Sequence, residues 1–123
     1  MTDVSKLEGA ELDAAVAFAM GMKIVTKQRT VGLRTWAAHP VTGFVGYIGG
    51  EHVPAFSPST LWSIGGPIIQ REGIALDCWP GRELAYRWRA AIAATTVNAC
   101  EYGPTPLIAA MRAFCAARSG TGG

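Results

Sequence analysis

The sequence has few charged residues and few histidines, and it has no long apolar run. Of its 123 residues only 16% are charged and two are histidine, and the formal net charge is +2. No uncharged apolar stretch reaches the roughly 18 residues of a membrane-spanning helix, and the start of the chain lacks a signal-peptide pattern. Basic runs are also absent, so nucleic-acid binding is not expected. These features predict a cytoplasmic protein without a membrane partner.

The cysteines are too far apart to suggest a metal site. Cys78, Cys100 and Cys115 show no metal-ligand spacing, either among themselves or with the two histidines. We therefore expect free and mostly packed thiols in a reducing compartment, with no metal and no cofactor.

Apolar residues are abundant: they make up 50% of the chain and include four tryptophans. The length fits one domain over residues 1–123 with a flexible tail over 119–123. A small surface with few charges tends to leave an apolar patch for a partner, so a homo-oligomer is expected.

Helix signals lie near both ends of the chain. The apolar stripe and early acidic residues of 7–22 predict a helix that ends at Gly21. A second helix is predicted over 105–117, because Thr105 is a natural N-cap and Pro106 suits the first helical position.

Strand signals lie between the predicted helices. Residues 23–26 and 43–49 could each form a short strand, and 74–79 with 84–92 predict an antiparallel hairpin turning at 80–83. Residues 93–103 are mostly small and are interpreted as a connection. The fold predicted is α+β, with a small antiparallel sheet flanked by an N-terminal and a C-terminal helix.

The stretch over 56–73, FSPSTLWSIGGPIIQREG, is the most irregular part of the chain. Gly65 and Gly66 tolerate unusual backbone angles, and Pro67 disfavours a helical conformation at the residue before it. We expect a shaped loop here, serving either as a structural corner or as the wall of a binding site.

The candidate site combines this loop with the entrance of the last helix, where free N–H groups could hold an anion. The alternative interpretation is a capped helix docked on a tight turn. No nucleophile motif and no phosphate-loop lysine is present, so an enzyme is not expected. The predicted ligand-binding residues are Phe56, Ser57, Trp62, Gly65, Gly66, Pro67, Arg71, Glu72, Gly103 and Thr105.

Three blocks of the sequence, LEGAELDAAVAFAMG, FSPSTLWSIGGPIIQREGI and YGPTPLIAAMRAFCAARSG, resemble the NinX-like family of small phage and prophage proteins. The family motif usually has an aspartate after the Ser-Thr pair, whereas this chain has Leu61. The resemblance implies an accessory protein acting in the host bacterial cytoplasm, and it brings no catalytic residues with it.

Two functions are consistent with these observations. The first is a non-enzymatic binder of a small nucleotide-like or anionic ligand, for example a sponge for a nucleotide that signals host defence. The alternative is a protein-interaction module that binds and alters a host protein. A ligand binder should have a concave cavity near Trp62 and Thr105, whereas an interaction module should have a flat apolar patch.

Overall fold

Helices and short strands alternate along the chain. The computed structural model describes residues 4–29, 32–40, 43, 45–49, 55–93 and 98–118, and the tail predicted over 119–123 lies outside them. In chain order the elements are η1 (Val4–Lys6), α1 (Gly9–Ala19), β1 (Lys23–Arg29), β2 (Gly32–Ala38), β3 (Val45–Ile48), α2 (Trp62–Glu72), β4 (Ala75–Cys78), η2 (Leu84–Tyr86), β5 (Trp88–Ala93), β6 (Asn98–Gly103) and α3 (Pro106–Arg118). None of these helices is long and apolar enough to cross a membrane.

The strands form two antiparallel sheets of three strands each, in the orders β1-β2-β3 and β4-β5-β6. In the first sheet Lys23 pairs with Ala38, and in the second Cys78 pairs with Trp88. The α+β prediction, with helices at both ends of the chain, is confirmed. The strands at 23–26 and 43–49 are confirmed as β1 and β3, and β2 is an additional strand between them.

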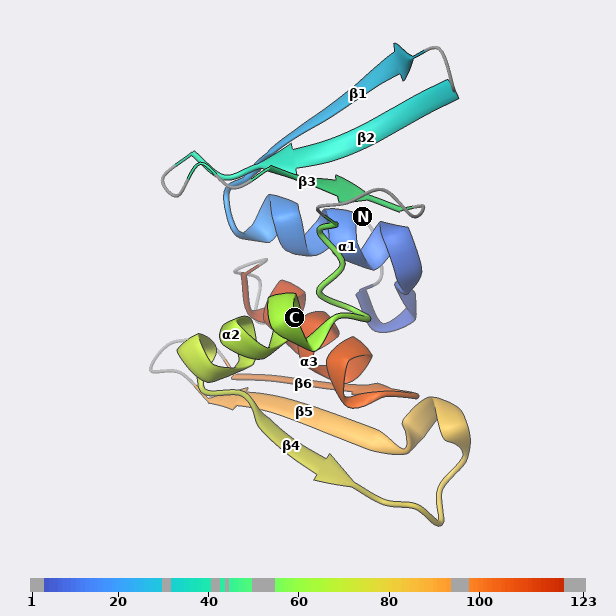
Figure 1. Cartoon of the computed structure of the whole chain (residues 1–123). Coiled ribbons are helices and arrows are strands. Elements are labelled where there is room, and N and C mark those ends of the chain that lie inside the picture. The colour runs from blue at the N-terminus through green and yellow to red at the C-terminus, as the bar shows by residue number, and fades with distance from the viewer. Residues whose placement is uncertain are drawn as a thin grey trace.

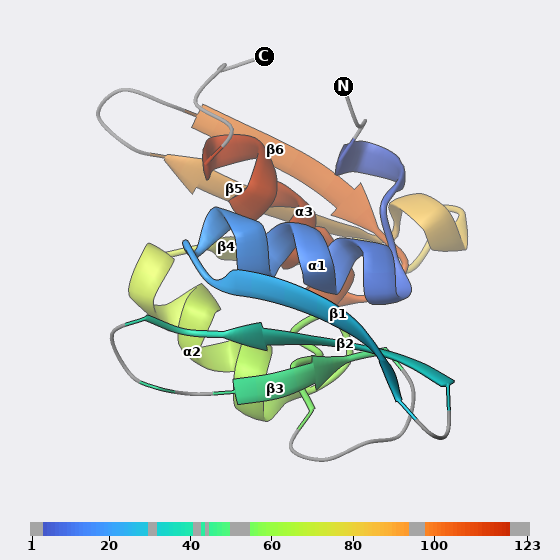
Figure 2. The same cartoon turned by 90° about the horizontal axis from the view of Figure 1, so that it is seen from above.

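The helices lie between the two sheets (Figure 1). α1 packs against the first sheet on one side and against α3 on the other, and α3 covers the second sheet. Leu12 and Val16 of α1 and Met111 and Phe114 of α3 are fully buried, so one continuous core runs through the helical layers. Seen from above, β1, β2 and β3 lie side by side with β2 in the middle (Figure 2).

Both predicted terminal helices are confirmed, and their ends follow the expected chemistry. Gly21 has a φ of 79°, the left-handed conformation that ends many helices. The Oγ1 of Thr105 accepts a hydrogen bond of 3.1 Å from the backbone N–H of Ile108, and Pro106 is the first residue of α3.

The predicted loop over 56–73 is wrong for its second half, which is helix α2. Gly65, Gly66 and Pro67 all lie inside this helix, so Pro67 does not move Gly66 out of the helical region. An internal proline removes its own bond to the carbonyl four residues earlier and its ring crowds that carbonyl, which costs about 3 kcal/mol. The remaining hydrogen bonds and the burial of Ile68 at one side of α2 sustain the helix.

The predicted hairpin is confirmed as β4 and β5, but its second strand is shorter than expected. Residues Leu84–Tyr86 form the 3-10 helix η2, and β5 begins only at Trp88. β4 ends at Cys78, so the alternating residues of η2 have no neighbouring strand to pair with. The connection predicted over 93–103 is also wrong in part, because β6 occupies Asn98–Gly103 and pairs with β5.

Arg112 lies in the middle of α3 and is buried, which is rare for an arginine. Its Nε donates a hydrogen bond of 2.8 Å to the Leu7 carbonyl, and its Nη1 donates one of 2.7 Å to the Tyr102 carbonyl. Arg112 therefore ties the N-terminal segment and β6 to α3.

Candidate ligand-binding site

Two hollows lie beside α2, and other parts of the chain complete each of them. We call the first the interhelix hollow; it has a volume of about 250 Å³. We call the second the methionine hollow; it has a volume of about 230 Å³. The interhelix hollow is lined by Ser59, Thr60, Trp62, Thr105, Pro106, Leu107 and Ile108. The methionine hollow is lined by Met20, Met22, His39, Phe56, Ser63, Ile64, Pro67, Ile68 and Arg71.

The interhelix hollow lies where α2 and α3 begin. The first N–H groups of a helix have no acceptor within the helix, and they carry positive potential. In α3 the Thr105 side chain satisfies one of them. In α2 the N-cap residue is Leu61, which provides no side-chain hydrogen bond. Leucine at this position therefore leaves the start of α2 without a side-chain cap.

A buried hydrogen bond anchors one edge of the interhelix hollow. The backbone N–H of Ser59 donates to Oδ1 of Asp13 at 2.9 Å, and only 2% of Ser59 and 4% of Asp13 are exposed. Burial raises the pKa of Asp13 above its ordinary 3.8, while the N–H and the hydroxyl of Ser59 oppose this rise. The Ser59 hydroxyl lies beside this carboxyl but, among the described residues, makes no hydrogen bond of good geometry.

Trp62 covers the interhelix hollow with a largely accessible ring. It is 54% exposed, although an indole of this size is usually well buried. A Cβ placed on Gly66 would meet Cε3 of the indole at 3.8 Å, so the ring lies along α2 above this glycine. An exposed indole at the edge of a hollow can stack on a flat ligand.

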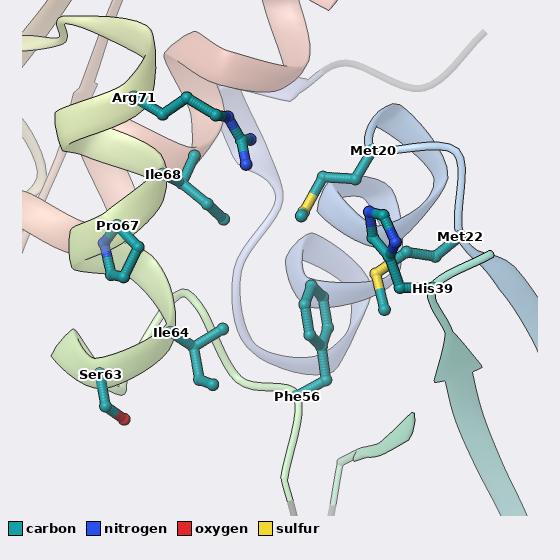
Figure 3. Close-up of a pocket in the computed structure, with 9 residues that line it drawn as sticks. All are labelled: Met20, Met22, His39, Phe56, Ser63, Ile64, Pro67, Ile68 and Arg71. Atoms are coloured by element: carbon teal, nitrogen blue, oxygen red, sulfur yellow. The ribbon is translucent and has the colours of Figure 1, made fainter. Parts of the chain in front are cut away.

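The methionine hollow lies on the side of α2 that faces α1 and the end of β2 (Figure 3). Met20 and Met22 follow the end of α1, His39 follows β2, and Phe56 precedes α2. Arg71 extends from α2 toward Met20. The Arg71 Nε also donates to a carboxylate oxygen of Glu72 at 3.0 Å.

The predicted site residues are divided between the two hollows. Trp62 and Thr105 line the interhelix hollow, whereas Phe56, Pro67 and Arg71 line the methionine hollow. Sequence reasoning did not place Ser59, Met20, Met22 or His39 in a site. Ser59 lies within the irregular stretch and could have been included, but no sequence signal links His39 to α2.

The other five predicted residues line neither hollow. Gly65 and Gly103 are tightly packed. A Cβ on Gly65 would lie 2.7 Å from Cδ2 of Leu107, and a Cβ on Gly103 would lie 2.8 Å from the backbone nitrogen of Ala109. Gly66 lies beneath the indole. The Ser57 carbonyl accepts hydrogen bonds from two N–H groups of the turn before α2. Glu72 bonds to Arg71 and, at 3.2 Å, to Arg118.

The thiols are less packed than expected. All three cysteines are free, but Cys78 and Cys100 are exposed and only Cys115 is buried. Burial raises the pKa of Cys115 to about 12, so its thiolate does not form near neutral pH. Within the described residues, no group of three His, Cys, Asp or Glu side chains could hold a metal ion.

Within the described residues the fold is α+β, with α1, α2 and α3 between the sheets β1-β2-β3 and β4-β5-β6. Residues 3–118 match the family model described as Bacteriophage P22, NinX, and the chain belongs to this phage family. The resemblance of the three sequence blocks is thereby confirmed. Among curated proteins, none matches the chain significantly.

Proposed function

We propose that this phage accessory protein binds a small anionic, nucleotide-like molecule in the interhelix hollow without transforming it. The observation that carries the proposal is the half-exposed indole of Trp62 beside a hollow where two helices begin. The indole provides a stacking surface for a flat ring. The uncapped start of α2 provides donors for a negative group, and both helix N-termini provide positive potential, although Pro106 has no N–H and the Ile108 N–H is bonded to Thr105.

The residues around the hollow favour an anion. No Asp or Glu lines it, and Ser59, Thr60 and Thr105 contribute hydroxyl groups. The uncapped start of α2 leaves N–H groups available to a ligand oxygen. No His, Cys or Lys lines it either, which supports binding without general acid–base or nucleophilic chemistry.

The size of the hollow restricts the ligand. Its volume of about 250 Å³ lies below the roughly 300–1,000 Å³ of most ligand pockets. It therefore suits one ring system with one acidic group, and a larger nucleotide would extend beyond Trp62. Sequestering a host defence nucleotide in the bacterial cytoplasm is the biological role that we propose for such binding.

Substitution of Trp62 tests the stacking part of this proposal. For the small molecule released from the purified protein, Trp62→Ala should weaken binding by about 1–3 kcal/mol, the usual loss for base–aromatic stacking. Trp62→Phe should retain part of the affinity. Calorimetric titration measures both, and unchanged affinity in a folded Trp62→Ala protein would exclude the indole from the site.

A matched pair of variants at Leu61 tests the anionic part. Asparagine and aspartate are similarly good N-caps, so Leu61→Asn and Leu61→Asp should affect the stability of α2 similarly. Only aspartate adds a negative charge beside the hollow, and it should therefore weaken the binding of an anion more than asparagine does. Equal affinities of the two variants would contradict an anionic ligand.

A second candidate function, interaction with a host protein, is favoured by an exposed surface on the connection between β4 and β5. Trp79, Leu84 and Tyr86 are all exposed there, and the Arg82 guanidinium lies 4.8 Å from the centre of the Trp79 ring. Aromatic residues and arginine are enriched at protein interfaces. If this surface binds a host protein, the double substitution Leu84→Ala and Tyr86→Ala should abolish its co-purification.

The predicted homo-oligomer also belongs to this proposal. Phe18 on α1 is 79% exposed, and Ile24 and Val45 on the first sheet are exposed as well. These apolar side chains are candidates for contact with a second copy of the chain. A Phe18→Ser protein should then have a smaller mass in solution than the wild type, whereas equal masses would exclude Phe18 from a self-association surface.

A further inference from the structure

The methionine hollow has the composition of a second binding site, separate from the interhelix hollow. Its walls are mostly apolar and come from three parts of the chain, with Met20 and Met22 after α1, Phe56 before α2, and Ile64 and Ile68 on α2 (Figure 3). Methionine side chains adapt to the shape of what they contact, and a mostly apolar hollow with a few polar groups is the usual form of a small-molecule site.

Arg71 gives this hollow a positive edge. Its Nε is bonded to Glu72, and no hydrogen bond to a described residue occupies its two Nη groups. Glu72 is also bonded to Arg118, so one carboxylate faces two guanidinium groups. The three side chains together therefore carry a net charge of about +1. No Asp or Glu lines the hollow, so nothing within it opposes an incoming anion.

We propose that the methionine hollow binds a small organic anion with one apolar ring system and one sulfonate, carboxylate or phosphate group. The ring lies against Met20, Met22 and Phe56, and the acidic group pairs with the Nη groups of Arg71. A volume of about 230 Å³ accommodates a ligand of this size. The inference is independent of the proposed function, because the two hollows share no lining residue.

Two fluorescent probes with the same rings test this proposal on the purified full-length protein. Naphthalene-2-sulfonate carries one ring system and the anion, and 2-naphthol carries the same ring system without a charge at neutral pH. Titrations should show saturable binding of the sulfonate, and any part of this binding that takes place in the interhelix hollow should be lost in Trp62→Ala. Arg71→Gln should weaken sulfonate binding about tenfold, which is the loss expected of one charge-assisted contact. The affinity for the neutral probe should change by less than about twofold.

Three further variants control for charge, space and the other hollow. Arg82→Gln removes one positive charge from the β4–β5 connection and should leave the binding of both probes unchanged. Trp62→Ala removes any probe binding in the interhelix hollow and should leave the Arg71-dependent binding in place. Ile64→Trp fills the methionine hollow and should abolish the binding of both probes. Cooperative unfolding of each variant excludes probe binding to a partly unfolded state.

Three results would overturn the proposal. The first is the absence of saturable binding by the wild type. The second is a loss of sulfonate affinity in Arg71→Gln no greater than that in Arg82→Gln. The third is a loss that follows Trp62→Ala instead of Arg71→Gln, which would place the probe in the interhelix hollow. Because Arg71 is half exposed, its substitution should not unfold the protein, so the comparison holds even if Ile64→Trp fails to fold.

Discussion

The same substitution at two adjacent glycines of α2 should have opposite effects on stability. Alanine is favoured over glycine within a helix by about 1 kcal/mol, so propensity alone would stabilise both Gly65→Ala and Gly66→Ala. At position 66 the new Cβ would make only an ordinary contact of 3.8 Å with the Trp62 ring. We therefore expect Gly66→Ala to raise the free energy of unfolding by up to about 1 kcal/mol.

At position 65 the surrounding structure cannot accept a methyl group. The new Cβ would overlap the backbone carbonyl oxygen of Pro58 and lie 2.7 Å from Cδ2 of Leu107. The carbonyl belongs to the backbone, so α2 would have to move away from α3. Overpacking of this kind costs about 3 kcal/mol at the upper end of its usual range. After the propensity gain, Gly65→Ala should be destabilised by about 2 kcal/mol.

Urea denaturation followed by circular dichroism measures both variants against the wild type. A difference of about 3 kcal/mol between them, with unchanged denaturant slopes, would establish the tight contact between α2 and the start of α3. If Gly65→Ala were as stable as Gly66→Ala, the packing described at this helix crossing would be refuted.

Two further predictions concern the buried carboxyl and the thiols. The pKa of Asp13 is higher in the folded protein than its ordinary value of 3.8, so the folded state holds the proton more tightly than the unfolded state. The stability that this proton provides is greatest below pH 3.8 and is lost as the pH rises through the folded pKa. Asp13→Asn keeps an acceptor for the Ser59 N–H and should remove the loss of stability with rising pH. Asp13→Ala leaves that N–H unpaired and should lower the free energy of unfolding by about 1–3 kcal/mol. Unfolding curves at several pH values compare the two variants, and equal stability would contradict the role of the hydrogen bond. With a thiol reagent at about pH 8, which is roughly four pH units below the Cys115 pKa of about 12, Cys78 and Cys100 should react in the native protein and Cys115 only after unfolding. Rapid labelling of native Cys115 would contradict its burial.

The helices near the two ends could be predicted because their boundary signals are local. Thr105 and Pro106 at the start of α3 and Gly21 after α1 act within one turn of the backbone. α2 was missed because Gly65, Gly66 and Pro67 are all poor helix formers. That helix depends on contacts with distant segments, above all the close approach of Gly65 to Pro58 and Leu107, which no local pattern encodes.

The candidate site could be predicted only in part for the same reason. Trp62 and Thr105 stand out in the sequence as an aromatic residue in an irregular stretch and as a helix N-cap, and the structure brings them to one hollow. The hydrogen bond between Ser59 and Asp13 joins residues 46 positions apart, and the sequence contains no signal for it. His39 and Arg71 line one hollow although they are 32 positions apart in the sequence, and this likewise depends on tertiary structure that no local pattern encodes.

Native mass spectrometry tests the binding of a small molecule by the interhelix hollow most directly. The wild-type protein and Trp62→Ala would be purified from the same bacterial host and measured before and after denaturation. We predict a bound small molecule on the wild type that absorbs ultraviolet light, is released by denaturation and is depleted in Trp62→Ala. A bare protein mass for both, or a co-purifying host polypeptide in place of a small molecule, would contradict ligand binding at this hollow.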